Sequence, residues 1–212
     1  MNLYLRTIVK TFAVSTHLPP IWGLKNRHNI KSHPFGGLGG KNLYMKIGLL
    51  SDTHGWIHPR LFDHFEGCDE IWHAGYIGNI ETADKLSAFK PLKAVYGNID
   101  DSKVRRAYKE NLIFMAEEVR TWITHIGGTP GHYDRKVSAA LNKNPPDLFI
   151  CGHSHIAKVM YDKNAGFLYM NPGAAGYNGF HKYMTAIRFQ INGKSIHDLE
   201  LIELGERGRI TL

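Results

Sequence analysis

The sequence has few cysteines, no long apolar run and no acidic residue near its N-terminus. Its two cysteines, Cys68 and Cys151, are too few for a disulfide framework, and their spacing matches no zinc knuckle. We therefore expect a reducing, cytoplasmic setting. No segment approaches the roughly 18 consecutive apolar residues of a membrane-spanning helix, so we expect no association with a membrane.

The net charge of +7 at pH 7 is unevenly distributed. Residues 1–44 contain six of the 26 lysines and arginines and none of the 19 aspartates and glutamates. The rest of the chain carries 20 basic and 19 acidic side chains, a net charge of +1. A nearly neutral folded part has no general electrostatic attraction for nucleic acid, so we expect no nucleic-acid partner.

Residues 1–44 have no sustained hydrophobic period and are broken by Pro19, Pro20 and a glycine-rich run at 36–40. An apolar segment typical of a buried strand starts directly after Met45. We expect the domain to span 45–212, and residues 1–44 to be a disordered extension or a product of translation from an upstream start. Their basic, acid-free composition is also compatible with a transit peptide.

The hydrophobic pattern after residue 44 predicts alternating strands and helices, followed by strands alone. Expected strands are 46–51, 70–74, 92–96, 111–115, 119–124, 148–151, 156–162, 167–171, 183–191 and 195–203, and expected helices lie near 59–65, 80–89 and 133–143. Asn79 is a suitable N-cap for the second helix, and 103–109 predicts a helical turn. This order predicts an α/β fold with two packed sheets and helices outside them.

Six side chains suited to binding metal follow directly after predicted strands. They are Asp52, His54, Asn98, His125, His153 and His155. In open α/β sheets, ligands bind beyond the carboxyl ends of the strands, so we expect these side chains to meet. Glycines flank nearly all of them, which allows tight turns and a close approach of the backbone.

Imidazole, carboxylate and amide ligands together suit borderline divalent cations. We expect manganese, with iron, zinc or nickel as alternatives. Six ligands exceed one tetrahedral site and suit two ions about 3.5–4 Å apart, an arrangement that activates water for the hydrolysis of phosphate esters.

The order Asp-x-His, Gly-Asn, His and Gly-His-x-His, from Met45 to about Glu203, resembles the calcineurin-like metallophosphoesterase superfamily. Within it, the compact YfcE-type phosphodiesterases look most similar. The resemblance implies a four-layer α/β/β/α sandwich of the metallophosphoesterase type and catalytic roles for Asp52, His54 and Asn98. It also implies one metal on Asp52, His54 and His155, and another on Asn98, His125 and His153. The segment Asn171-Pro172-Gly173 resembles a turn that lies beside the site in the family.

Two positions depart from the family pattern. Ile99 stands where larger members carry a histidine that protonates the leaving group. Because general-acid help is typically worth about 10²–10⁴-fold, we expect substrates with good leaving groups. Asp100 could assist instead, although a structural hydrogen bond is the expected role of its carboxylate.

The second departure is Tyr76, which stands where the family has an aspartate that bridges the two metals. A phenol is neutral at pH 7 and bulkier than a carboxylate. Three readings remain open: a change of one base, since Asp and Tyr codons differ by one; loss of the site in a non-catalytic protein; or an altered site that holds one metal.

Other polar residues have both functional and structural readings. Lys103, Arg105 and Arg106 could hold a phosphate, or could form a solvated helix face. His132 and His181 are next to glycines and could reach the site.

We expect a metal-dependent phosphoesterase, either a phosphodiesterase or a phosphatase, that acts on a small phosphoester and is impaired by Tyr76. The alternative is a weakly active or inactive scaffold of the same fold, similar to a retromer subunit, that binds proteins. The sequence leaves homo-oligomerisation open.

Overall fold

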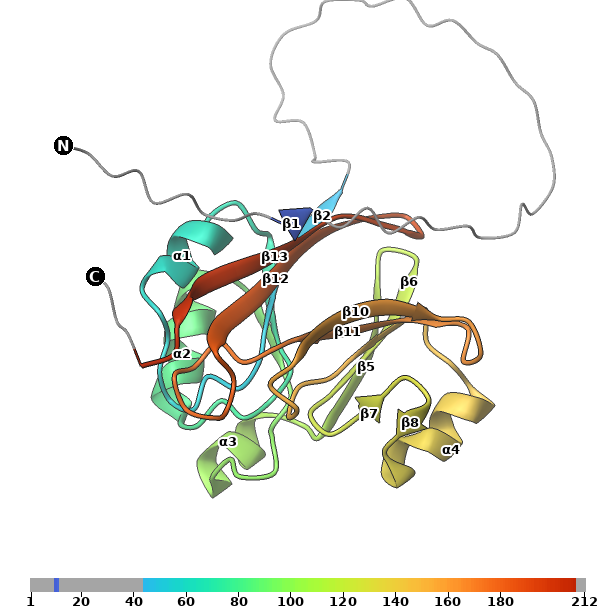
Figure 1. Ribbon diagram of the computed structural model, residues 1–212, viewed down its shortest axis with the longest axis horizontal. Helices are drawn as coiled ribbons and strands as arrows, with labels where there is room; N and C mark the ends of the chain where they lie inside the picture. Colours follow the sequence, from blue (N-terminus) through green and yellow to red (C-terminus); the bar gives the residue numbers. More distant parts are fainter. Residues whose placement is uncertain (1–9, 12–43, 209–212) are drawn as a thin grey trace, which may run out of the picture.

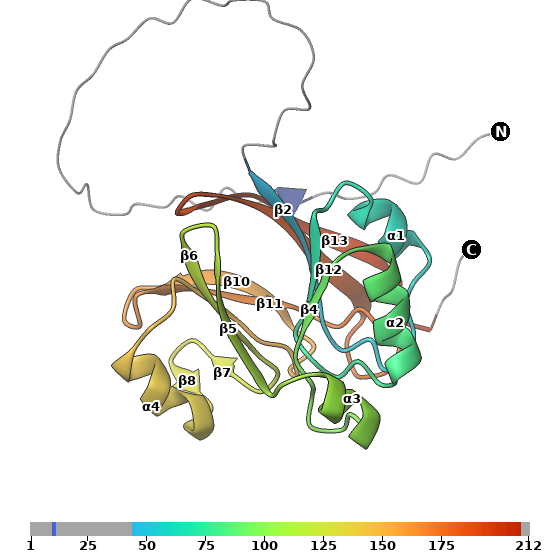
Figure 2. The same cartoon turned by 180° about the vertical axis from the view of Figure 1, so that it is seen from behind.

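The computed structural model describes residues 10–11 and 44–208 (Figure 1). Two β-sheets face each other in this part of the chain. Helices α1 (Arg60–Phe65) and α2 (Ile80–Phe89) lie outside the first sheet, and α4 (Arg135–Lys143) lies outside the second (Figures 1 and 2). No helix of the described residues is long and apolar enough to cross a membrane.

The first sheet has six strands in the order β1-β13-β12-β2-β3-β4. Their bounds are β1 Lys10–Thr11, β2 Met45–Leu50, β3 Glu70–His73, β4 Leu92–Ala94, β12 Tyr183–Asn192 and β13 Ser195–Glu206. Strands β2, β3 and β4 are parallel, with Leu50 opposite His73 and His73 opposite Ala94. Because parallel strands end at the same edge, the loops that follow these three strands lie together.

The second sheet has five strands in the order β10-β11-β9-β6-β5. Their bounds are β5 Asn111–Ala116, β6 Val119–Thr124, β9 Leu148–Ile150, β10 Ala157–Asp162 and β11 Phe167–Pro172. Strands β6 and β9 are parallel, with Ile123 opposite Ile150, so the segments that carry His125 and His153 also leave the sheet at one edge. A separate hairpin pairs β7 (Gly128–Thr129) with β8 (His132–Tyr133).

Alternating side chains of the strands build separate cores between four layers. Ile47 and Leu49 of β2 pack with Ile123 and Ile150 in the core between the two sheets. Leu50 faces the other way, toward α1 and α2. On the outer face of the second sheet, a further core joins the sheet to α4; its members include Trp122, Phe149, Tyr169, Val137 and Leu141. The period of two in the strands thus produces the expected α/β/β/α sandwich.

The expected elements agree with the structure to within a few residues at their ends. The side chain of Asn79 accepts a hydrogen bond from the N–H of Thr82 and caps α2, as predicted. The ambiguous segment after Asp100 forms helix α3 (Ser102–Ala107). The β7–β8 hairpin was not predicted. The expectation for residues 1–44 falls outside the described residues, except for Tyr44 and for Lys10–Thr11, which pair with β13.

Candidate metal centre

The loop after β2 runs alongside the loop after β3. The N–H groups of Asp52, His54 and Gly55 donate to the carbonyl oxygens of Gly75, Tyr76 and Ile77 at 3.0, 3.2 and 2.7 Å. This ladder continues the pairing of β2 and β3 beyond the sheet. It fixes the first two candidate ligands relative to the position of Tyr76.

Left-handed backbone conformations concentrate at this site. Seven non-glycine residues of the described part have a positive φ angle, and five of them belong to the site. These are Asp52, His54, Tyr76, His153 and His155, with φ between 53° and 67°. Such conformations are unfavourable for residues with a Cβ and cluster at functional sites, where neighbouring structure holds them.

Two glycines bring the backbone close to His125. A Cβ on Gly75 would lie 2.7 Å from the His125 side chain. A Cβ on Gly97 would lie 2.9 Å from Cδ2 of His125 and 2.5 Å from the backbone nitrogen of Tyr76. Larger residues would separate these loops. The glycines beside the predicted ligands therefore have a packing role at these two positions.

Asp52 is fully buried at the centre of the site. Its Oδ2 accepts hydrogen bonds from Ser51 Oγ at 2.5 Å and from the N–H of His153 at 3.1 Å. Its Oδ1 has no hydrogen-bond partner, although Nε2 of His155 lies 3.3 Å away and Nε2 of His125 lies 3.8 Å away. Burial raises the pKa of the carboxyl, but His155, His125 and Ser51 together hold it below its ordinary value. Asp52 is therefore an anion with one oxygen left free.

His125 presents an unprotonated nitrogen to this oxygen. Nδ1 of His125 is 2.8 Å from the carbonyl oxygen of Ala74. Since a carbonyl only accepts, Nδ1 carries the proton and Nε2 has a free lone pair. That Nε2 is buried and has no hydrogen-bond partner. Burial lowers the pKa of His125, and it lowers the pKa of His54 to about 4, so both rings are neutral at pH 7.

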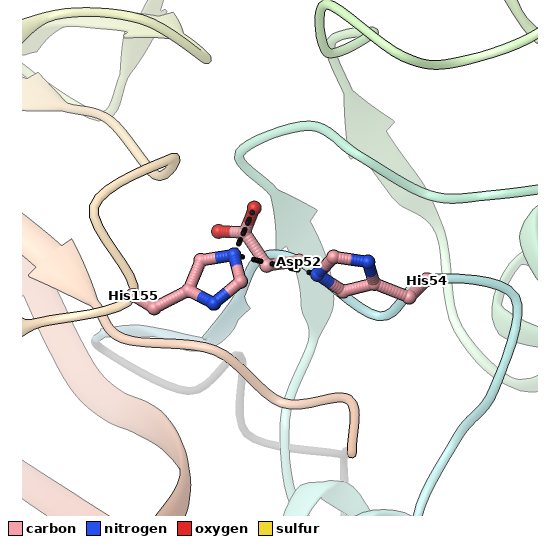
Figure 3. A group of neighbouring side chains, drawn as sticks. All are labelled: Asp52, His54 and His155. Atoms are coloured by element: carbon pink, nitrogen blue, oxygen red, sulfur yellow. Dashed lines mark hydrogen bonds and ion pairs between the residues drawn. The ribbon is translucent and has the colours of Figure 1, made fainter. Parts of the chain in front are cut away.

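Three of the six candidate ligands form one compact group. The ligand atoms of Asp52, His54 and His155 all lie within 4.8 Å of one another, and Nε2 of His54 is 3.3 Å from Nε2 of His155. Figure 3 shows one nitrogen of His155 facing both the carboxylate of Asp52 and the ring of His54. The free, buried Oδ1 of Asp52 beside these imidazole nitrogens fits a bound cation. A carboxylate and two imidazoles suit a borderline divalent metal.

The other three candidates lie next to this group. The ring of His153 is 5.3 Å from the ring of His125, centroid to centroid. Asn98 is exposed and lines two clefts. One, of about 510 Å³, also contains His54, His153 and His155; the other, of about 1000 Å³, also contains His125. The structure thus brings the six side chains to one region, with Asn98 and His153 at its accessible side.

Tyr76 lies over His54, with the two ring centroids 3.8 Å apart. Its centroid is 6.4 Å from that of His125. Burial and the negative charges of Asp100 and Asp52 raise the pKa of its phenol, so the hydroxyl is neutral at pH 7. Tyr76 therefore supplies no negative charge between the Asp52 group and His125, where a bridging carboxylate would supply one.

Asp100 has the structural role expected of it. Its buried carboxylate accepts hydrogen bonds from the N–H groups of Ile77, Gly78 and Gly97 at 3.1, 2.7 and 2.7 Å. It thereby ties the Tyr76 loop to the Asn98 loop. The guanidinium of Arg105 donates to the carbonyl oxygens of Asp100, Gly97 and Asn98. Arg105 thus braces this loop, which is neither of the two roles considered from the sequence.

His73 is a fully buried residue whose role the sequence did not reveal. The N–H of Gly75 donates to its Nδ1 at 3.1 Å, so its Nε2 carries the proton and donates to Thr53 Oγ1 at 2.9 Å. Thr53 Oγ1 in turn donates to the carbonyl oxygen of Ile77. Burial lowers the pKa of His73 to about 4. This chain of hydrogen bonds connects the loop after β2 to the loop after β3.

Asn171 holds the loop that bears His153 and His155. Its Nδ2 donates to the carbonyl oxygen of Gly152 at 2.8 Å and to Ser154 Oγ at 3.1 Å. This agrees with the expected turn beside the site. His181 lies against His155, with ring centroids 5.2 Å apart, whereas His132 is exposed on β8 and does not line the cleft at His54 and His155.

Comparison with known proteins identifies the family. Residues 45–194 match the model of the calcineurin-like phosphoesterase superfamily domain. No curated protein sequence gives a significant match.

Similar solved structures share the fold at low identity. Zinc-complexed Vps29 from Entamoeba histolytica is 18% identical with a TM-score of 0.57, covering 76% of this chain and 100% of its own. An archaeal phosphodiesterase is 20% identical with a TM-score of 0.56, covering 75% and 99%. A predicted phosphoesterase from Streptococcus pneumoniae is 16% identical with a TM-score of 0.53, covering 76% and 98%. By its sequence match over residues 45–194 and by its fold, the chain belongs to the calcineurin-like phosphoesterase superfamily.

Proposed function

We propose that this protein is a metal-dependent phosphoesterase that hydrolyses a phosphodiester or another small phosphoester. One observation carries the proposal: Asp52 Oδ1 and His125 Nε2 are buried acceptor atoms 3.8 Å apart, and neither has a hydrogen-bond donor. An unpaired buried polar atom costs about 1–3 kcal/mol. A divalent cation near these atoms would offset that cost.

The compact group supports one metal more strongly than two. Asp52, His54 and His155 form a complete set of three ligands. A second ion on Asn98, His125 and His153 would lack the bridging carboxylate, because Tyr76 is neutral. We propose manganese as the metal, with iron, zinc or nickel as alternatives, and weak occupancy of the second position.

The side chains would divide the work as follows. Divalent cations in such sites supply charge neutralisation at the phosphoryl oxygens and lower the pKa of a water molecule. Asp52, His54 and His155 would hold the cation at the buried end of the site. Asn98, on the exposed side, can donate its amide N–H to a phosphoryl oxygen. Ile99 cannot protonate a leaving group, so good leaving groups are favoured.

The test is hydrolysis of a chromogenic diester such as bis(p-nitrophenyl) phosphate with added Mn²⁺. We expect slow, metal-dependent turnover that falls at least about 10-fold in His155→Ala, because His155 belongs to the compact group proposed to hold the metal. His132→Ala is the matched control, because His132 is exposed on β8 and does not line the site. Metal-independent turnover, or equal rates in both variants, would contradict the proposal.

A scaffold that binds other proteins is the second candidate, and Tyr76 is the observation that favours it. Loss of the bridging charge weakens the site, and the similar folds include both Vps29 and a phosphodiesterase, so fold alone does not choose. An absence of turnover with every divalent metal, in a protein that still folds, would support the scaffold.

The setting that we propose is the cytoplasm, with a small phosphoester as the substrate and without nucleic acid or membrane as partners. Both cysteines are unpaired and buried, which agrees with a reducing compartment. Fractionation of cells that express the tagged protein would test the location.

A further inference from the structure

Three exposed apolar side chains stand around the cleft that opens on His54 and His155. Ile99 and Ile156 expose 62% and 67% of their surface, and Phe180 is fully exposed. All three line the same cleft of about 510 Å³. They come from the loops after β4, after β9 and between β11 and β12, so segments far apart in the sequence build this apolar edge.

The same cleft has no strongly charged lining. Apart from its histidines, its polar residues are Tyr76, Asn98 and Ser154, and no lysine, arginine, aspartate or glutamate among the described residues lines it. The guanidinium of Arg105, near the Asn98 loop, already donates hydrogen bonds to three backbone carbonyl oxygens. Any negative charge on a ligand would therefore be balanced at the buried candidate metal centre.

We infer that the substrate is a phosphodiester with a single negative charge that carries an aryl or comparably apolar ester group, which lies against Ile99, Ile156 and Phe180. This inference rests on the proposed function, because it assigns the substrate class of the same site. The phosphoryl group faces His54, His155 and Asn98, and the apolar group covers the edge.

The lining of this cleft matches a ligand of that kind. Exposed apolar side chains that line one concave site are typical of ligand binding. A cleft of about 510 Å³ suits a small molecule. A phosphomonoester, which is largely dianionic at neutral pH, would require lysine or arginine partners of the kind that usually hold it, and this cleft does not provide them.

Binding of phosphonate methyl esters, whose methoxide is a poor leaving group, tests the inference without appreciable turnover. The probes are methyl phenylphosphonate and methyl methylphosphonate, which carry the same charge and differ only in phenyl against methyl. With Mn²⁺ present, calorimetry on the full chain should give at least about 10-fold tighter binding of the phenyl probe. Phenylphosphonate, the dianionic counterpart, should bind more weakly than its methyl ester. Equal affinities for the phenyl and methyl probes would overturn the inference.

Matched variants locate the contact. Phe180→Ala and Ile156→Ala should each reduce the phenyl-to-methyl affinity ratio by at least about threefold. Tyr161→Ala and Met115→Ala are the controls, since these apolar residues are 43% and 58% exposed outside this cleft. A ratio that falls equally in all four variants, or in none, would contradict the assignment.

The outcome separates this inference from the proposed function. A phenyl preference that depends on Phe180, in a protein that hydrolyses no diester, would support the binding site and refute the phosphoesterase. Metal-dependent hydrolysis without any phenyl preference would support the phosphoesterase and refute the apolar binding site.

Discussion

Replacing Tyr76 with aspartate should restore a second metal ion. The position suits the change, because Tyr76 has a φ of 55° and aspartate tolerates this left-handed region better than most residues. The other candidate ligands are already present in the surrounding loops. The substitution removes a neutral ring packed against His54 and places a carboxylate on the loop beside the Asp52 group.

The expected gain follows from Coulomb's law. Two unit charges 4 Å apart attract by about 4 kcal/mol at an effective dielectric constant of 20. Desolvation of the new carboxylate opposes part of this, which leaves about 2–3 kcal/mol. That net gain corresponds to an affinity for the second ion that is higher by about 100-fold.

Calorimetric titration with Mn²⁺ should report one strong site in the parent and two in Tyr76→Asp, with faster hydrolysis of the chromogenic diester. Tyr76→Asn is the matched control, because it removes the ring without adding charge and should keep one site. The reasoning is refuted if Tyr76→Asp binds no second ion, or if the parent already binds two ions tightly.

Three further predictions concern stability. A chain that starts at Met45 should melt at the same temperature as the full chain; a large fall would show that residues 1–44 stabilise the domain. Asp100→Ala should lower the free energy of unfolding in urea by about 3 kcal/mol, since three backbone N–H groups lose their acceptor, and Asp100→Asn should cost less. The pKa of His73 is about 4 in the folded protein and about 6.5 in the unfolded chain. The free energy of unfolding should therefore be unaffected by His73 above pH 6.5, and should fall between pH 6.5 and pH 4 by up to about 1.4 kcal/mol per pH unit as the unfolded chain takes up the proton. His73→Asn keeps an acceptor for Gly75 and should flatten this slope; an unchanged slope would assign the pH dependence to other groups.

The sequence alone predicted those features of the fold and of the site that depend on local patterns. The short apolar runs of the strands and the Asn79 cap are local features. The positions of Asp52 and His155 at strand ends follow from the general rule for α/β sheets. From these features we could predict the sandwich fold and the edge of the sheets at which the candidate site lies.

The rest depends on contacts between segments far apart in the chain. The partners of His73 and Asp100 are backbone groups of neighbouring loops, and no spacing in the sequence reveals which groups these are. Phe180 lies in an irregular loop, so no periodic pattern indicates that it reaches the cleft. The left-handed conformation of Tyr76 likewise depends on the ladder between two loops.

The most direct test of the central claim is the metal stoichiometry of the purified protein. Equilibrium dialysis against Mn²⁺ should give about one tightly bound ion per chain in the parent and in Tyr161→Ala, and at least about 10-fold weaker binding in His155→Ala. If the parent binds no divalent metal, or if His155→Ala binds as tightly as the parent, then Asp52, His54 and His155 do not form a metal centre.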